Sequence, residues 1–321
     1  MRVLITGMSG FAGQHLADLL LRETHWTLIG ASRDTQGDRQ SQRVLWWQID
    51  LKNADAVKRL LKYERPDVIV HMAAQAHVPT SWQNARATYE DNVLSQLNLF
   101  EGIIAAKLTP RVLVISSNEV YGRPASRDVL PYREDYPLHP NNPYAVSKCT
   151  QDLMALQYHI SHGYDVLVAR PFNHIGPRQA ARFVAADFAQ QIAEIEAGQR
   201  EPVMMLGNMS TERDFTDVRD VAHAYFDLIK NGEAGEVYNV CSGRPCSIQH
   251  LLDVMLGMST AKIEQRTDPA KFRPADTPIS YGDAAKIRAA TGWEARIPFE
   301  QTVNDILNGW REQVKKVKIE S

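Results

Sequence analysis

Tyr144 and Lys148 are the pair whose residue types and spacing best fit chemistry. They stand four positions apart in Tyr144-Ala145-Val146-Ser147-Lys148, so on a helix both side chains share one face. A phenol with a pKa near ~10 is a poor acid at neutral pH, and a neighbouring ammonium favours the phenolate and lowers that pKa. The phenol could then exchange a proton with a carbonyl or an alcohol. An exposed pair on a helix surface is the alternative interpretation of this spacing.

A hydroxyl group precedes this pair at the end of an expected strand. The run Val114-Ile115-Ser116-Ser117 is followed by Asn118-Glu119-Val120-Tyr121-Gly122. A serine at the carboxyl end of a strand, upstream of the tyrosine, can hydrogen-bond the same substrate oxygen, and Ser117 is the candidate for that role. An ordinary turn or capping serine is the alternative.

A glycine-rich segment near the start of the chain predicts a phosphate-binding loop. Thr6-Gly7-Met8-Ser9-Gly10-Phe11-Ala12-Gly13 follows an expected first strand and opens an expected helix. The first glycine allows the tight turn, the second lets the backbone approach a pyrophosphate, and the third allows close packing of helix on strand. The helix N-terminus supplies free N–H groups and a positive dipole end. The segment therefore predicts a dinucleotide cofactor.

The residues after the second expected strand indicate which dinucleotide. An NAD protein places an acid against the ribose 2′-OH about 20 residues past the glycines. Here Ser32 and Arg33 stand in that region, a hydroxyl donor and a cation. Both suit a 2′-phosphate, so we predict NADP(H) over NAD. The alternative is that Arg33 is a solvated loop cation and Asp34 is the ribose ligand.

The elements that must position these groups alternate along the first half of the chain. Short apolar runs without alternation predict strands buried on both faces, and helical patterns lie between them. This order predicts an α/β fold, a Rossmann-type doubly wound parallel sheet with a smaller C-terminal substrate-binding lobe. We assign 1–172 and about 216–242 to the cofactor domain, and about 173–215 and 243–321 to the lobe. The expected strands are Arg2–Thr6, Trp26–Ala31, Val44–Ile49, Asp67–His71, Arg111–Ser116, Asp165–Arg170 and Glu236–Val240.

Composition excludes several classes of protein. The 321 residues carry a net charge of -2, which gives no broad attraction to nucleic acid or to an anionic membrane. No apolar run approaches the ~20 residues that span a bilayer, and Met1 and Arg2 lead directly into an expected strand. The three cysteines lack CxxC spacing and the histidines are scattered, so we expect a cytoplasmic protein without a metal site.

Together these motifs resemble the extended short-chain dehydrogenase/reductase family, in its sugar-nucleotide-modifying branch. The resemblance covers essentially the whole chain and implies that Ser117, Tyr144 and Lys148 are the catalytic triad. It also implies a set of cofactor-binding residues, which includes the tyrosine and lysine of that triad. The set is Gly7, Ser9, Gly10, Phe11, Ala12, Gly13, Ser32, Arg33, Asp50, Leu51, Ala73, Ala74, Gln75, Asn92, Ser116, Tyr144, Lys148 and Phe172.

Later segments narrow the resemblance to two related families. Arg170–Gln179, Arg213–Asp220, Gly235–Gly243 and Arg273–Asp276 are similar to GDP-6-deoxy-4-keto-D-mannose reductases and to GDP-mannose 4,6-dehydratases. The first resemblance implies NADPH-dependent reduction of the 4-keto group of GDP-6-deoxy-4-keto-D-mannose to GDP-D-rhamnose. The substrate contacts that it implies are Asn173, Arg178, Val184, Arg213 and Arg273.

Glu119 keeps a second reaction open. In the dehydratases an acid at this position removes a proton beside the keto group, so Glu119 is also a candidate catalytic residue; a structural carboxylate is the alternative. Asn118 departs from the Asp-Glu of glucose-type dehydratases, and we favour the reductase. A GDP-mannose 4,6-dehydratase, or another sugar-nucleotide dehydratase or epimerase, is the alternative. A non-catalytic NADP-binding redox sensor is more remote, because such proteins typically lack the Tyr or the Lys.

The stretch from Val93 to Ile104 predicts a partner. Its residues are apolar around much of the helix, so one face can cover the sheet while another needs a second contact. In relatives this helix and the Tyr144 helix form a four-helix bundle between two subunits, and we expect a homodimer. Burial of the helix within one chain is the alternative.

Overall fold

The fold is described from a computed structural model that covers residues 1–33, 42–268 and 277–320, with side chains to residue 316. Two of the predicted ligand positions, Asp34 and Arg273, lie outside these ranges. Within them, no helix is both long enough and apolar enough to cross a membrane. The same ranges contain no group of three or more His, Cys, Asp or Glu residues arranged to hold a metal.

A seven-stranded parallel sheet forms the centre of the molecule, as predicted. Its order is β10-β6-β5-β4-β1-β2-β3. Strands β2 and β3 are added on one side of β1 and β4 on the other, so the switch point of the strand order lies between β1 and β4. Every predicted strand is present, and each end lies within one residue of the expected position. The strands are β1 (Arg2–Thr6), β2 (Thr27–Ser32), β3 (Val44–Gln48), β4 (Val68–His71), β5 (Arg111–Ile115), β6 (Val166–Pro171) and β10 (Val237–Val240).

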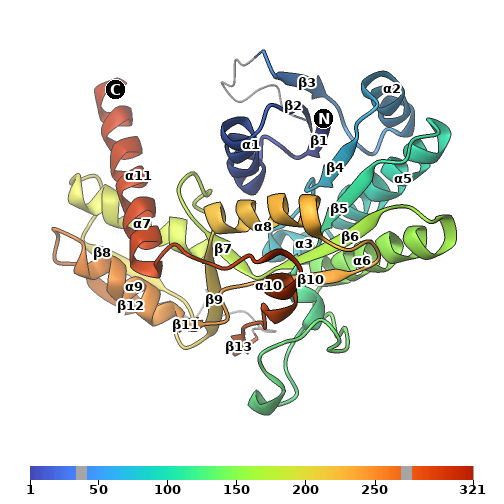
Figure 1. The fold of residues 1–321 in the computed structure, drawn as a ribbon. Coiled ribbons are helices and arrows are strands. Elements are labelled where there is room, and N and C mark those ends of the chain that lie inside the picture. The colour runs from blue at the N-terminus through green and yellow to red at the C-terminus, as the bar shows by residue number, and fades with distance from the viewer. Residues whose placement is uncertain (34–41, 269–276, 321) are drawn as a thin grey trace.

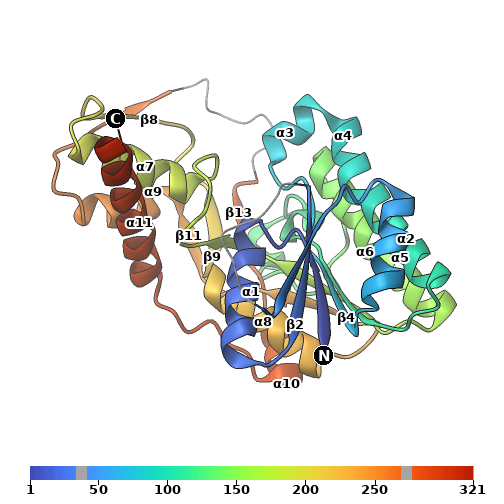
Figure 2. The same ribbon diagram turned by 90° about the horizontal axis from the view of Figure 1, so that it is seen from above.

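Helices cover both faces of this sheet, as Figure 2 shows. One apolar core joins the sheet to α1, α8 and α10, and a second core joins its other face to α2, α5 and α6. The short helices α3 and α4 and a π-helical turn lead into α5, and two short 3-10 helices follow β5. The helices of this part are α1 (Phe11–Glu23), α2 (Ala54–Glu64), α3 (Val78–Gln83), α4 (Ala85–Tyr89), η1 (Glu90–Leu94), α5 (Ser95–Ala105), η2 (Asn118–Tyr121), η3 (Arg127–Val129), α6 (Pro143–His162), α8 (Val218–Asn231) and α10 (Ala285–Thr291).

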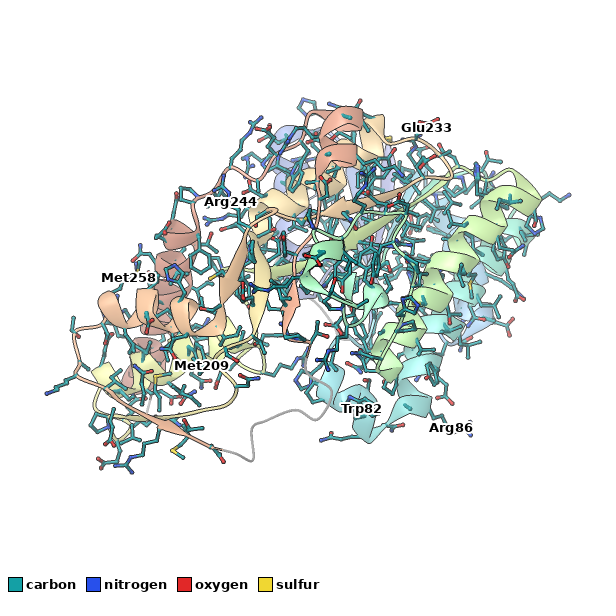
Figure 3. The ribbon with its side chains drawn as sticks, turned by 90° about the horizontal axis from the view of Figure 1, so that it is seen from below. Trp82, Arg86, Met209, Glu233, Arg244 and Met258 are labelled. Atoms are coloured by element: carbon teal, nitrogen blue, oxygen red, sulfur yellow. The ribbon has the colours of Figure 1, made fainter. Side chains whose placement is uncertain are left out.

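A smaller lobe with its own apolar core lies beside the large sheet (Figure 1). Figure 3 shows Met209 and Met258 in this lobe, and Trp82 and Arg86 on the part that contains α3 and α4. Ile287 of α10 and Trp293 pack in the core of the large sheet, although both fall in the range assigned to the lobe. The elements of the lobe are β7 (Asn173–Ile175), α7 (Val184–Glu196), β8 (Val203–Leu206), β9 (Glu212–Asp217), β11 (Pro245–Ser247), α9 (Ile248–Gly257), β12 (Glu264–Thr267), β13 (Ile279–Ser280) and α11 (Phe299–Glu320).

Helix α6 has local signals at both of its ends. Asn142 is the N-cap, and its side-chain oxygen accepts a hydrogen bond of 2.8 Å from the backbone N–H of Ala145. Pro143 occupies the first turn, where its missing N–H costs nothing. Gly163 ends the helix in the left-handed conformation, with φ 67°. These signals place Tyr144 and Lys148 in the first two turns of the helix, next to the end of β5.

Candidate active site

Lys148 is buried at the end of β5. Its Nζ donates a hydrogen bond of 2.8 Å to the carbonyl oxygen of Ile115, and the side chain is 3% exposed. Burial lowers the pKa of Lys148 to about 8, while the nearby Asp152 carboxylate raises it. The amine is therefore close to its titration point at neutral pH.

Tyr144 and Ser117 lie together beside this lysine. Burial raises the pKa of the Tyr144 phenol above its usual value, the Ser117 hydroxyl lowers it, and the Glu119 carboxylate raises it. The lowering expected from Lys148 is not among the effects on the Tyr144 phenol, and burial is the largest of those that act on it. The phenol is therefore held in its protonated form, which is the form that can donate a proton to a reduced carbonyl oxygen.

Glu119 occupies a position next to this group. Its Oε2 accepts a hydrogen bond of 3.0 Å from Asn142 Nδ2, and its backbone N–H donates to Ser117 Oγ at 3.2 Å. The carboxylate thus connects the turn after β5 to the N-cap of α6. Its position is compatible with the structural role and with the role of a base.

The glycine-rich loop has the close backbone approach that its sequence predicts. Gly7 has φ 72° and donates its N–H to the carbonyl oxygen of Ala31 at 2.8 Å. A Cβ atom on Gly13 would lie 2.4 Å from the carbonyl oxygen of Gly7, so only glycine fits there. Gly10 is the N-cap of α1 and makes no side-chain cap, which leaves the N–H groups of Phe11 and Ala12 directed at the loop. Ser9 lies in the same turn.

The loop after β4 is fastened to the catalytic helix by Asn92. Its Oδ1 accepts a hydrogen bond of 2.7 Å from the Gln75 N–H, and its Nδ2 donates to the Gln75 carbonyl oxygen and to Ser147 Oγ. Ala73 packs against Gly7, since a Cβ on Gly7 would lie 3.0 Å from the Ala73 backbone. Ala73, Ala74 and Gln75 therefore border the glycine-rich loop.

The predicted ribose and adenine residues lie together at the ends of β2 and β3. Ser32 ends β2 and Arg33 follows it, while Leu51 is buried and Asp50 is partly exposed. The Arg33 guanidinium is ion-paired with Asp91 at 3.2 Å. Asp91 was not among the site residues predicted from the sequence.

The four predicted substrate residues within the described ranges lie on separate segments, and Asn173 and Arg213 lie on the paired strands β7 and β9. Asn173 begins β7, and its Oδ1 is buried without a hydrogen-bond partner among the described residues. Arg213, on β9, donates to the Thr277 carbonyl oxygen at 2.7 Å, and Val184 opens α7 against the core of the lobe. Arg178, with φ 74°, directs its guanidinium at Asp18 of α1, 2.8 Å away.

Two cofactor candidates are deeply buried. Phe172 is 2% exposed and lies in an aromatic cluster with Tyr121 and Tyr132. Ser116 is 3% exposed, and its hydroxyl faces the Asp152 carboxylate, whose pKa it lowers.

A buried ion pair between α6 and β6 was not anticipated. Asp152 Oδ2 accepts a hydrogen bond of 2.7 Å from Arg170 Nε, with the two side chains 0% and 5% exposed. Asp152 lies one helical turn after Lys148. Its spacing of four residues from Lys148 was the available signal, since i and i+4 share a helix face.

The fold and this constellation define an extended short-chain dehydrogenase/reductase. A glycine-rich loop precedes α1, and on α6 Tyr144 contacts Ser117 while Lys148 donates to Ile115 at the end of β5. The family model for GDP-mannose 4,6 dehydratase matches residues 4–306, and the chain belongs to that family.

Individual relatives agree with this assignment. The chain is 38% identical over 316 residues to a GDP-6-deoxy-D-mannose reductase of Pseudomonas aeruginosa, covering 98% of this chain and 99% of that protein. It is similar to the structure of RMD from Pseudomonas aeruginosa complexed with NADPH, with a TM-score of 0.86, 36% identity, and coverage of 97% and 99%. It is also similar to the dTDP-glucose 4,6-dehydratase DesIV of Streptomyces venezuelae with NAD and TYD bound, with a TM-score of 0.86, 27% identity and 98% of each chain covered.

Proposed function

We propose that this protein is an NADPH-dependent sugar-nucleotide 4-ketoreductase that converts GDP-6-deoxy-4-keto-D-mannose to GDP-D-rhamnose. The observation that carries the proposal is the meeting of Ser117, Tyr144 and Lys148 at the end of β5, beside the glycine-rich loop. Full-length similarity at 38% identity to a GDP-6-deoxy-D-mannose reductase supports the substrate.

The residues around the loop fit a dinucleotide. The backbone at Gly7 and Gly13, where a Cβ atom has no room, suits a polar ligand that approaches the loop closely. The N-terminus of α1 would hold the pyrophosphate, and Arg33 the 2′-phosphate. NADPH, when bound, supplies the hydride that reduces carbon 4.

The protein's own groups perform the other half of the reduction. Ser117 donates a hydrogen bond to the keto oxygen, and Tyr144 delivers its proton to that oxygen as negative charge develops. Lys148, held by the Ile115 carbonyl, stabilises the charge that remains on the tyrosine oxygen and would bind the nicotinamide ribose. Asn173, with its buried unpaired oxygen, is the proposed contact with the substrate diphosphate region, and Arg213 and Arg273 are proposed as further phosphate contacts.

A dehydratase is the second candidate, and Glu119 is the observation that favours it. A dehydratase oxidises carbon 4, removes a proton beside the keto group and then returns the hydride, so it needs a base and a retained cofactor. The contact with Asn142 supports a structural role for Glu119 instead. A reductase needs no such base.

One experiment separates these functions. The purified protein is mixed with NADPH and GDP-6-deoxy-4-keto-D-mannose, NADPH absorbance is followed, and the product is examined by NMR at carbon 4. A reductase consumes one NADPH for each keto sugar and yields GDP-D-rhamnose. A redox sensor binds NADPH without consuming it, and a dehydratase converts GDP-mannose to a keto product without net loss of NADPH. Either of those two results would overturn the proposal.

We also propose a homodimer formed by α5 and α6 of two subunits. Val146, Leu153 and Ile160 stand seven residues apart on α6 and are 38%, 60% and 80% exposed. A groove of about 410 Å³, lined by Leu94, Leu97 and others, runs between α6 and the start of α5. Apolar residues repeating every seven positions on an exposed helix are typical of a helix–helix interface.

The cellular setting and the division of the chain belong to the same proposal. Cys149, Cys241 and Cys246 are all free, which suits a reducing cytoplasm. The large sheet is proposed to hold the cofactor, and the lobe built around β9 to hold the nucleotide sugar.

A further inference from the structure

Two cations share one carboxylate at the adenine end of the proposed cofactor site. Asp91 Oδ2 lies 3.2 Å from Arg33 Nη1, and Asp91 Oδ1 lies 3.0 Å from Lys52 Nζ. The three residues come from three segments, since Arg33 follows β2, Lys52 lies after β3 and Asp91 belongs to the π-helical turn η1. Their meeting is therefore a property of the fold and not of local sequence.

The backbone that carries Lys52 is held firmly. Asn98 Nδ2 donates to the carbonyl oxygens of Leu51 and Lys52, both at 2.9 Å, and the Lys52 N–H donates to Asp50 Oδ1 at 3.0 Å. Next to Arg33, the Ile49 N–H donates to the Ser32 carbonyl oxygen at 2.7 Å. The segments that present the two cations are thus joined to each other and to α5.

The side chains themselves remain open to solvent. Arg33 is 61% exposed, Lys52 31% and Asp91 16%. Because the two cations are open to solvent although the carboxylate is mostly covered, their ion pairs with Asp91 contribute little to stability, and a better anion can become their partner. A phosphate monoester carries up to two negative charges and three acceptor oxygens, and it pairs with two cations better than one carboxylate does.

Asp91 also keeps Lys52 charged. The hydrogen bond and the charge of Asp91 raise the pKa of Lys52 above its usual value. The Asp91 carboxylate therefore holds the two cations near each other, each within ion-pair distance of one of its oxygens.

We propose that Lys52 is a second cation for the 2′-phosphate of NADPH beside Arg33, and that Asp91 holds the two cations until the phosphate takes its place. The inference rests on the proposed function, because it concerns the cofactor of that reaction. It adds a specificity-determining residue that lies 19 positions after Arg33 in the sequence.

The test compares two small ligands that differ only in the 2′-phosphate. The dissociation constants of 2′,5′-ADP and 5′-AMP are measured by calorimetry for the wild type, for Lys52→Gln and for Lys58→Gln. Lys58 is an exposed lysine of α2, so its variant loses the same charge nearby. Loss of one charge-assisted contact should weaken 2′,5′-ADP about tenfold in Lys52→Gln and leave 5′-AMP unchanged. Lys58→Gln should leave both ligands at wild-type affinity.

The Asp91→Asn variant is an independent test, in which the affinity for 2′,5′-ADP should rise instead of fall. Removal of the carboxylate takes away a repulsive charge, so 2′,5′-ADP should bind several-fold more tightly while 5′-AMP does not change. The gain should diminish as salt is added, since the cations are exposed. Thermal unfolding of each variant reports whether the fold is kept.

The outcomes distinguish this inference from the proposed function. If the wild type bound 2′,5′-ADP and 5′-AMP with equal affinity, the proposed use of NADPH as the cofactor would be contradicted. If the wild type preferred 2′,5′-ADP and Lys52→Gln kept that preference in full, the role of Lys52 would be rejected and the proposed use of NADPH would stand. Weaker binding of 2′,5′-ADP to a folded Asp91→Asn would reject the role given to Asp91.

Discussion

The ammonium nitrogen of Lys148 lies 2.8 Å from the carbonyl oxygen of Ile115, the last residue of β5. Ser116 and Ser117 continue directly from that strand, and Tyr144 precedes Lys148 by one turn on α6. This hydrogen bond and the one from Asn142 to Glu119 join the end of β5 to α6, and so help to fix the proposed hydroxyl donor relative to the proposed acid. Because the strand end is buried, small shifts of α6 are resisted by the packing of the sheet.

The pH dependence of catalysis should follow the charge of Lys148. Its pKa is lowered to about 8 by burial, so the ammonium is present below that pH and is lost as the pH rises through it. We expect kcat/KM, which reports the free enzyme, to fall by about tenfold per pH unit above ~8. Steady-state rates measured across the range will check this, and a flat profile to high pH would contradict it.

Asp152→Asn should move that alkaline limb to lower pH. The Asp152 carboxylate raises the pKa of Lys148, and its removal leaves Lys148 easier to deprotonate. Arg170 also loses its buried partner, which should lower the free energy of unfolding by about 3 kcal/mol. The pH profile of kcat/KM and denaturant unfolding measure the two effects.

Two further variants separate charge from structure. Asp152→Glu keeps the charge and should keep the limb near its wild-type position. Glu64→Gln removes another buried carboxylate, which pairs with Arg2 far from the site. It should lower stability without moving the limb. An unmoved limb in Asp152→Asn would leave that residue a purely structural role.

Tyr144→Phe should abolish turnover and preserve cofactor affinity. The phenol oxygen is the proposed proton donor, so its loss should lower kcat by about 100-fold or more. The ring is 93% buried, since 7% of the residue is exposed, and phenylalanine fills the same volume. NADPH binding, followed by fluorescence, should stay within about twofold of the wild type. Near-normal turnover would reject the assignment of Tyr144.

The strands of the large sheet were predictable because each strand can be recognised from its own apolar sequence, without knowledge of its neighbours. Apolar runs such as Val112–Ile115 have no alternation, as expected for strands covered on both faces, and every expected strand formed. The glycine-rich loop was also predictable in part, because Gly13 packs on Gly7 and Met8 within the same segment, whereas Gly7 packs on the distant Ala73. The common helix face of Tyr144 and Lys148 could be predicted from their spacing of four residues alone.

Contacts between distant segments were not predictable in the same way. Arg178, which the resemblance implies as a substrate contact, also pairs with Asp18, 160 positions earlier in the chain. The bond of Asn142 to Glu119 depends on how the turn after β5 meets α6. Asp91 and Lys52 meet only because three separate segments converge. Such pairings depend on the tertiary structure and leave no local pattern.

Glu119→Gln should leave reduction largely intact. The carboxylate accepts a hydrogen bond from Asn142, and the amide oxygen of glutamine can accept the same bond. We expect NADPH consumption within about tenfold of the wild type, because a ketone reduction needs no base at this position. The measurement is made in D2O with the keto sugar. A loss above about 100-fold, together with deuterium next to the keto carbon in the wild type, would favour the dehydratase mechanism.

Leu153→Glu should convert the proposed dimer to a monomer. Leu153 is 60% exposed at the middle of the seven-residue repeat on α6, and a carboxylate there would be buried without a partner in a helix–helix interface. Sedimentation at micromolar concentration should show a dimer for the wild type and a monomer for the variant. Tyr63→Glu is the matched control, because Tyr63 is 78% exposed on α2, away from the repeat, and its variant should remain dimeric. A wild type that sediments as a monomer, or a Leu153→Glu variant that stays dimeric, would exclude α6 as the interface.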